Sequence, residues 1–117
     1  MRIFAIHEYE LRKGVDAEEF EDVLKDALTS NELDLLGLES RHFLKGYKSE
    51  RKGEYAVLWI FESQEALESL FGTEYEPKQG PQNFVSFERN LLARYLDRPP
   101  HMIMYTDYWE LASRSCR

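Results

Sequence analysis

The segment 54–63 constrains the fold of this chain more than any other, because it is apolar on both of its alternating rows. Side chains along a β-strand point alternately to the two faces of the sheet. One row is compact and aliphatic: Ala56, Leu58 and Ile60. The other row is mostly aromatic: Tyr55, Val57, Trp59 and Phe61. Both faces of this strand therefore need cover.

The length of the chain limits what can supply that cover. With 117 residues, we expect enough helix for one face of a sheet only. Something other than the chain's own helices is then expected to cover the aromatic row. The candidates are a second copy of the protein, a ligand, or both.

Composition indicates a single compact unit. The chain is 43% hydrophobic and 32% charged, and a domain of this size buries roughly 65% of its unfolded surface without needing a disulfide or a metal. We predict one domain over residues 1–112 and a frayed polar tail over residues 113–117. The only cysteine, Cys116, cannot form an internal disulfide.

The net charge of −7 argues against nucleic acid and against an anionic membrane surface as partners, since either needs a basic stripe. The amino terminus enters a short strand pattern instead of a signal segment, and no apolar run approaches about 18 residues. We therefore predict a cytoplasmic protein with no nucleic-acid and no membrane partner.

Hydrophobic periodicity and capping residues define an order of elements. Asp16 followed by Glu19 is typical of a helix start, and Ser63 is typical of another. The expected elements are a strand over 2–11, a helix after Asp16, strands over 38–47 and 54–62, a helix after Ser63, a helical stripe over 84–96, and a strand from His101 or Met102 to Leu111. The loop from Gly72 to Pro81 is either a pocket lid or a plain connector, and we favour the connector.

This order is typical of an α+β fold with a four-stranded antiparallel sheet and its helices on one face. In the split arrangement that it favours, the first and third strands are central. Those are also the two most apolar strands, so the two observations agree.

Two junctions resemble a known superfamily. The run Phe61-Glu-Ser-Gln-Glu-Ala-Leu67 enters a helix, and it follows Tyr9-Glu-Leu-Arg-Lys-Gly-Val-Asp-Ala-Glu-Glu-Phe20. This order of elements resembles the dimeric α+β barrel superfamily, which includes antibiotic-biosynthesis monooxygenases, haem-degrading enzymes, stress-responsive A/B barrel proteins, polyketide cyclases and NIPSNAP-like proteins. The resemblance implies a ferredoxin-like sheet in each subunit, two subunits packed face to face as a homodimer, and a pocket in or beside the barrel.

The functional residues of these families transfer to this chain only in part. The plant cyclase uses a histidine early in its first strand and another after its second helix. Here Ala5 holds the early position, His7 lies one step further along the same row, and no histidine follows Phe71 in its loop. The haem-degrading members bind haem through a histidine, and this chain has no histidine near its second helix. The cofactor-independent monooxygenases need only an apolar pocket with a few hydrogen-bonding groups, so we predict no cofactor and no metal.

Candidate site residues follow from the rows of the central strands. If the odd rows face the barrel, His7, Tyr9, Val57 and Trp59 line a common cavity, as small-molecule sites are usually built. His7 could act as a general acid or base, or it could be satisfied by a carboxylate in the dimer interface. Tyr9 and Trp59 could bind an aromatic ligand or anchor an interface. Arg41 and His42 are expected to be solvated.

The last strand adds two residues. It is rich in aromatic and sulfur-bearing side chains for an edge strand, so we expect a partner subunit to cover it. If Tyr105, Asp107 and Trp109 share the inner row, Asp107 could orient His7 and Tyr105 could contact the substrate. We therefore predict His7 and Asp107 as catalytic residues, and Tyr9, Val57, Trp59 and Tyr105 as substrate-binding residues.

Two functions remain open from the sequence. The first is a homodimeric small-molecule-binding protein, catalysing a cofactor-independent monooxygenase-type reaction on an aromatic or polyketide-like compound. The second is a non-catalytic dimeric module whose aromatic sheet face is only a subunit interface. Fold-level similarity cannot choose between them.

Overall fold

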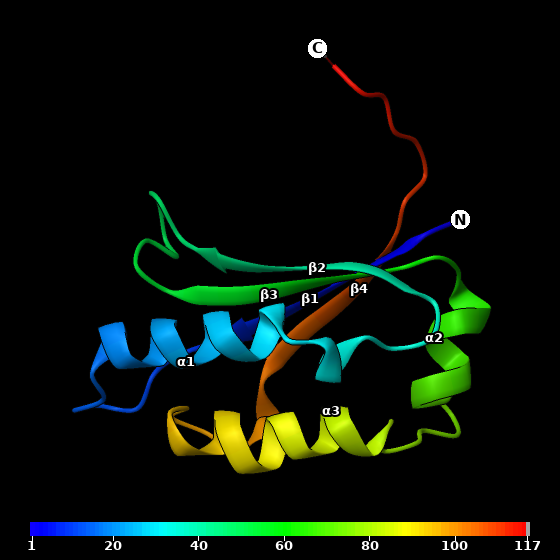
Figure 1. Cartoon of the computed structure of the whole chain (residues 1–117). Coiled ribbons are helices and arrows are strands. Elements are labelled where there is room, and N and C mark those ends of the chain that lie inside the picture. Colours follow the sequence, from blue (N-terminus) through cyan, green and yellow to red (C-terminus); the bar gives the residue numbers. More distant parts are fainter. Residues whose placement is uncertain (117) are drawn as a thin grey trace.

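The computed structural model describes residues 1–116. Its four strands form one antiparallel sheet in the order β2-β3-β1-β4. The strands are β1 (Ile3–Tyr9), β2 (Leu38–Lys45), β3 (Tyr55–Phe61) and β4 (Met104–Trp109). The first and third strands are central, as predicted, and all helices lie on one side of the sheet (Figure 1). The predicted fold class is confirmed.

Three helices form the layer below the sheet in Figure 1. They are α1 (Ala17–Thr29), α2 (Gln64–Phe71) and α3 (Gln82–Ser86). α3 continues through a π-helical segment at Phe87–Leu91 and a 3-10 turn at Leu92–Arg94, and a further 3-10 turn at Pro100–Met102 precedes β4. Residues 110–116 form no regular element, and residue 117 of the predicted tail lies outside the described residues.

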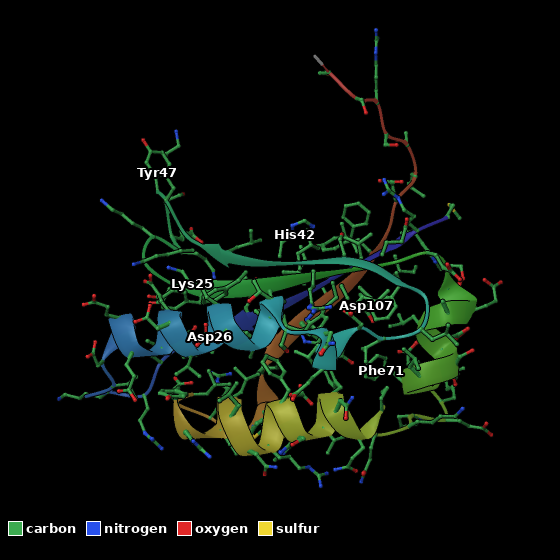
Figure 2. The ribbon with its side chains drawn as sticks, viewed as in Figure 1. Lys25, Asp26, His42, Tyr47, Phe71 and Asp107 are labelled. Atoms are coloured by element: carbon green, nitrogen blue, oxygen red, sulfur yellow. The ribbon has the colours of Figure 1, made fainter. Side chains whose placement is uncertain are left out.

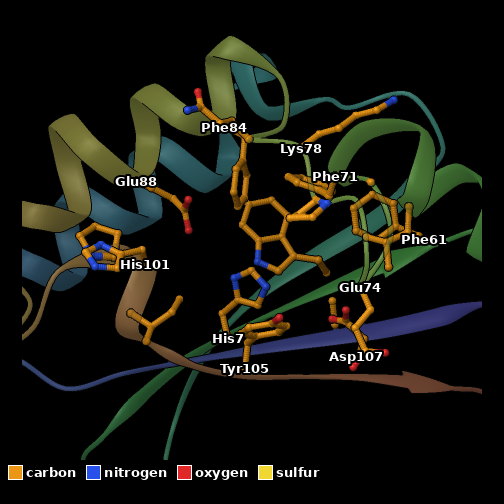
Figure 3. A pocket seen from close by; sticks show the side chains of 18 of the residues that line it. His7, Phe61, Phe71, Glu74, Lys78, Phe84, Glu88, His101, Tyr105 and Asp107 are labelled. Carbon is orange, nitrogen blue, oxygen red and sulfur yellow. The ribbon is translucent and has the colours of Figure 1, made fainter.

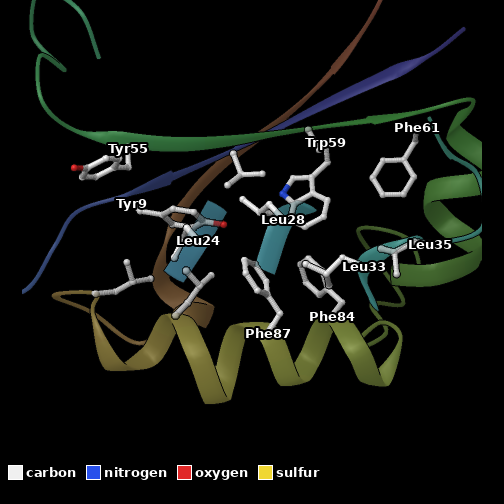
Figure 4. Close-up of a cluster of buried hydrophobic side chains, with 14 of the residues drawn as sticks. Tyr9, Leu24, Leu28, Leu33, Leu35, Tyr55, Trp59, Phe61, Phe84 and Phe87 are labelled. Carbon is white, nitrogen blue, oxygen red and sulfur yellow. The ribbon is translucent and has the colours of Figure 1, made fainter. Parts of the chain in front are cut away.

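The aromatic row of β3 packs on the chain's own helices, so the expectation that it needs outside cover is wrong. Tyr55, Val57, Trp59 and Phe61 are at most 2% exposed. Figure 4 shows Trp59 above Phe84 and Phe87 of the α3 region, with Leu24 and Leu28 of α1 beside them. Aromatic side chains bury 150–250 Å² each, so placing them between sheet and helices removes the most apolar surface that one chain can bury.

The aliphatic row is the one that the helices leave open. Antiparallel partners share a face, so the pairs Ile6↔Leu58 and Leu58↔His42 place these three side chains on the side away from the helices. Figure 2 shows His42 projecting from that face. Tyr108, on the same row of β4, is 54% exposed. One apolar face of the sheet is thus uncovered in the single chain, as the sequence predicts, but it is the opposite face.

Two predicted helix caps are confirmed. The Asp16 carboxylate accepts a hydrogen bond of 3.0 Å from the amide of Glu18, and the Ser63 hydroxyl accepts one of 3.1 Å from the amide of Ala66. Each bond satisfies an amide that has no partner within its helix. These caps fix where α1 and α2 begin relative to the strands before them.

Arg41 holds the end of α1 onto the sheet, and the expectation that it is solvated is wrong. Its guanidinium donates hydrogen bonds to the carbonyls of Leu28 (2.8 Å), Leu33 (2.9 Å) and Ser30. It also pairs with the Asp34 carboxylate at 2.9 Å. The last carbonyls of a helix lack partners within it, and a fork of charged donors suits them well. Arg41 therefore has a structural role.

Within the described residues, none of the helices has both the length and the apolar character that crossing a membrane requires.

Candidate functional site

A cavity of about 640 Å³ lies on the helix side of the sheet, next to β4. Its floor comes from β1, β3 and β4, and its walls come from α2, α3, the loop after α2 and the turn before β4. Figure 3 shows Phe61, Phe71, Phe84 and Tyr105 around it. A volume in the range of 300–1,000 Å³ is typical of small-molecule sites, and so is a wall that combines aromatic side chains with polar ones.

His7 lies in the middle of this wall. Its ring centroid is 5.9 Å from that of Tyr105, 6.2 Å from that of Trp59 and 6.3 Å from that of Phe84. Its Nδ1 atom is buried and has no hydrogen-bond partner among the described residues. Burial lowers the pKa of His7 to about 4, because a charged imidazole would lose its hydration. The ring is therefore neutral at physiological pH and can accept or donate a hydrogen bond.

Glu88 is a cavity residue that the sequence analysis missed. It belongs to the π-helical segment, it is half-buried, and Figure 3 shows its carboxylate directed from the helix into the cavity, whereas His7 comes from the sheet. Burial raises its pKa to about 7, and the Arg89 charge opposes this only in part. A carboxyl group with this pKa can exchange a proton or hold a cation at neutral pH.

A signal for Glu88 was present in the sequence. The stripe Phe84, Phe87, Leu91 and Leu92 predicts the buried face of a helix, and residue 88 lies four positions from both Phe84 and Leu92. Residues four apart share a helix face. A glutamate within an apolar stripe is uncommon in a plain core position. Segments with π-helical turns are also frequent at functional sites.

Trp59 lies between the cavity and the core. It lines the cavity, it is 1% exposed, and its indole N–H has no partner among the described residues. A buried donor left without an acceptor costs about 1–3 kcal/mol.

Tyr9 and Val57, predicted to bind substrate, lie deeper in the core and are not among the cavity-lining residues. Tyr9 is 1% exposed, and its hydroxyl also lacks a partner within the described residues. Burial and, second, the charge on Glu88 raise the pKa of Tyr9. Tyr9 therefore stands behind the cavity and is influenced electrostatically by Glu88.

Tyr105 and Asp107 both line the cavity from β4, and pairing with His7 and Ala5 places them on the helix side of the sheet. Tyr105 is directly opposite His7, whereas Asp107 is two residues further along. Asp107 makes no hydrogen bond to His7 Nδ1, although both residues line the cavity. Partial desolvation raises the pKa of Asp107, although the residue is exposed. The structure thus brings these residues into one cavity without the expected contact.

The loop after α2 is part of the cavity wall, so the preference for a plain connector is wrong. The residues that it contributes are Gly72, Thr73, Glu74, Pro77, Lys78 and Gln79. Gly72 has a φ of +76°, and a side chain there would meet the carbonyl oxygen of Glu76. The Lys78 amide donates to the carbonyl of Phe71 at 2.8 Å, which closes the loop onto the end of α2.

In the described part of the chain, no three histidine, cysteine or acidic side chains are grouped as a metal site would need.

No protein-family model and no curated protein matches this sequence. Solved structures match over nearly the whole chain. A dimeric ferredoxin-like protein of unknown function from Jannaschia sp. is 18% identical, with a TM-score of 0.66, over 94% of this chain and 100% of that one. A dabb family protein with a ferredoxin-like fold from Mesorhizobium loti is 17% identical, with a TM-score of 0.61, over 95% and 98%.

A third solved structure is a candidate antibiotic biosynthesis monooxygenase from Bacteroides thetaiotaomicron. It is 14% identical to this chain, with a TM-score of 0.60, over 99% of this chain and 95% of that one. At these identities the similarities show the fold alone. The fold is ferredoxin-like, as the resemblance implied.

Proposed function

We propose that this protein is a homodimer that binds a small aromatic compound in the cavity between its sheet and its helices. The main support is the cavity itself, which has a volume of about 640 Å³. Its lining includes aromatic side chains and His7, whose Nδ1 atom has no hydrogen-bond partner among the described residues. Apolar walls with a few convergent polar groups are how most small-molecule sites are built. The aromatic sheet face is filled by the chain's own helices, which argues against its being only a subunit interface.

The reaction that we propose is a cofactor-independent monooxygenase-type oxidation of an aromatic or polyketide-like compound. It is favoured because such chemistry asks the protein for a pocket that holds the aromatic substrate beside groups that move protons. Neutral His7 and the carboxyl groups of Glu88 and Asp107 are the candidates for proton transfer. The monooxygenase-like relative in fold is consistent with this proposal.

The homodimer is proposed from the open face of the sheet. Ile6, Leu58 and Tyr108 leave an apolar surface on the side away from the helices. An apolar face of this kind is normally covered by another protein surface. Similar structures are described as dimeric, which supports a second copy as the cover.

Thermal shift with a panel of hydroquinones, aromatic polyketides and haem tests the cavity. A ligand at 100 times its dissociation constant raises the unfolding free energy by about 2.7 kcal/mol. Tyr105→Ala should weaken binding, because Tyr105 lines the cavity at 65% exposure and its loss leaves the core intact. Tyr47→Ala is the matched control, since Tyr47 is 84% exposed on a distant hairpin. The absence of a shift with every aromatic class would contradict the proposal.

Once a ligand has been identified, the reaction is tested by measuring the rate of oxygen consumption by the wild-type protein, His7→Ala and Asp107→Asn. Loss of turnover with ligand binding retained is expected for groups that transfer protons. Unchanged affinity and turnover in His7→Ala would remove His7 from the mechanism.

Native mass spectrometry at micromolar concentration tests the dimer. Leu58→Glu places a charge in the centre of the open sheet face and should yield monomers. Leu36→Glu is the matched control, because Leu36 is 86% exposed in the loop before β2. A monomeric wild-type protein would overturn the dimer and leave the cavity proposal standing.

A further inference from the structure

The charged side chains of the cavity wall are mainly acidic. They are Glu74, Glu88, Asp107 and Lys78. The amine of Lys78 is directed to the backbone carbonyl of Ser69 at 3.5 Å, and Figure 3 shows it extending away from Glu88. His7 is neutral at physiological pH. The cavity therefore presents carboxylates without a cation of the chain directed at Glu88.

Glu88 is the least exposed of these carboxylates, since it is half-buried whereas Glu74 and Asp107 are exposed. Among the described residues, the influences on its ionisation are desolvation and the charge on Arg89, an exposed side chain, and no hydrogen bond contributes. A half-buried carboxylate with no paired cation is unfavourable, because burial removes hydration without replacing it. A ligand with a positive charge would supply the cation that the chain does not place beside Glu88.

The aromatic walls favour the same kind of occupant. Trp59 and Phe84 lie with ring centroids 5.4 Å apart, and Phe84 and Phe71 with centroids 4.9 Å apart. The faces of such rings attract cations, tryptophan most strongly, and the attraction grows when water is excluded. Trp59 and Phe84 both line the cavity, so their rings form part of the wall that an occupant meets.

We propose that the ligand of this cavity is an aromatic compound bearing a protonated amine, with its ammonium group against Glu88 and its ring against the aromatic wall. This inference rests on the proposed function, since it assigns a charge to the aromatic ligand proposed there. A neutral or anionic ring of the same size would fill the cavity but leave Glu88 unpaired.

Proton linkage gives the inference a second signature. An ammonium group holds Glu88 ionised, so binding at pH 6 must first remove the proton that the free protein carries there. With a pKa of about 7 in the free protein, affinity should fall about tenfold from pH 8 to pH 6. The other titratable and charged groups facing this region are His7, Tyr9, Glu74, Lys78, Arg89, His101, Tyr105 and Asp107.

Isothermal titration of the full-length chain with three indoles tests the proposal. Tryptamine carries an ammonium group, tryptophol a hydroxyl group and indole-3-acetate a carboxylate on the same ring. We expect tryptamine to bind at least tenfold more tightly than tryptophol, and indole-3-acetate to bind most weakly. Glu88→Gln should weaken tryptamine about tenfold, leave tryptophol within twofold and abolish the pH dependence. His101→Gln should retain the pH dependence, which separates Glu88 from the histidine of the same wall.

Glu65→Gln is the matched control, because Glu65 is an exposed residue of α2 outside the cavity wall. Equal affinity for tryptamine and tryptophol would overturn the cationic ligand and leave the aromatic cavity intact. An equal loss of affinity for tryptamine and tryptophol in Glu88→Gln would overturn the cationic ligand as well. If none of the indoles binds while a neutral hydroquinone does, the inference again fails alone. If no aromatic compound of any charge binds, the inference and the proposed function fail together.

Discussion

Glu88→Gln should stabilise the ligand-free protein at alkaline pH. In the folded chain the pKa of Glu88 is raised from 4.5 to about 7, so the folded state holds this proton more tightly than the unfolded state. The unfolding free energy therefore falls as the pH rises from about 4.5 through about 7. At 1.36 kcal/mol per pH unit, the full effect is roughly 3 kcal/mol. Glutamine keeps the shape of the protonated side chain and has no such loss.

The assay is urea unfolding of the wild-type protein and Glu88→Gln at constant ionic strength. Between pH 5.5 and pH 8 the difference in unfolding free energy between them should shift by roughly 2 kcal/mol in favour of Glu88→Gln. For a chain of this length, that is roughly 8 °C in Tm. Contributions of other groups cancel in the difference. A difference independent of pH, or a Glu88→Gln protein less stable at pH 8, would refute the assignment of Glu88 to a desolvated site.

Three further predictions concern positions outside Glu88. Arg41→Ala should lower the unfolding free energy by about 2–3 kcal/mol, because three carbonyls lose a charged donor. Arg41→Lys should recover less than half of that loss. An Arg41→Ala protein as stable in urea as the wild type would contradict the structural role of Arg41. Ser63→Ala should cost about 1 kcal/mol through the uncapped amide of Ala66, whereas Ser63→Asp should cost little. The His7 ring should titrate in NMR with a midpoint near 4. Because the unfolded chain takes up this proton at about pH 6.5, the unfolding free energy should fall as the pH drops from about 6.5 to about 4. A midpoint near 6.5 would show that the ring is solvated.

The elements of the fold were predictable from the sequence because each has a local cause. Asp16 and Ser63 accept hydrogen bonds from the first amides of their helices, and β1 and β3 are short apolar runs bounded by polar segments. The order of elements then leaves few arrangements, since strands in an antiparallel sheet with helices on one face have limited ways to connect.

The choice of face was not predictable in the same way. Both rows of β3 are apolar, so alternation locates two faces but does not say which one the helices cover. The outcome depends on the volume between sheet and helices, which Phe20, Phe84 and Phe87 help to fill. That volume is a property of the packed chain and of no single segment.

The candidate site was predictable in part. Cross-strand pairing brings His7 and Tyr105 together, so assigning them to one cavity required only the topology. Tyr9 lies on the same row but is 1% exposed and is not among the residues that line the cavity. The helix face of Glu88 could be predicted from its spacing to Phe84 and Leu92, whereas the π-helical turn to which it belongs has no simple sequence pattern.

The central claim is that the cavity beside Trp59 is a site for a small aromatic molecule. The chain has two tryptophans, and only Trp59 lines the cavity, whereas the indole N–H of Trp109 donates to the side chain of Gln64 at 3.2 Å. The direct measurement is an NMR titration of the two indole N–H resonances with an aromatic ligand. The resonance of Trp59 should move with saturation while that of Trp109 stays in place. Movement of Trp109 alone, or of neither resonance at saturating ligand, would contradict the claim.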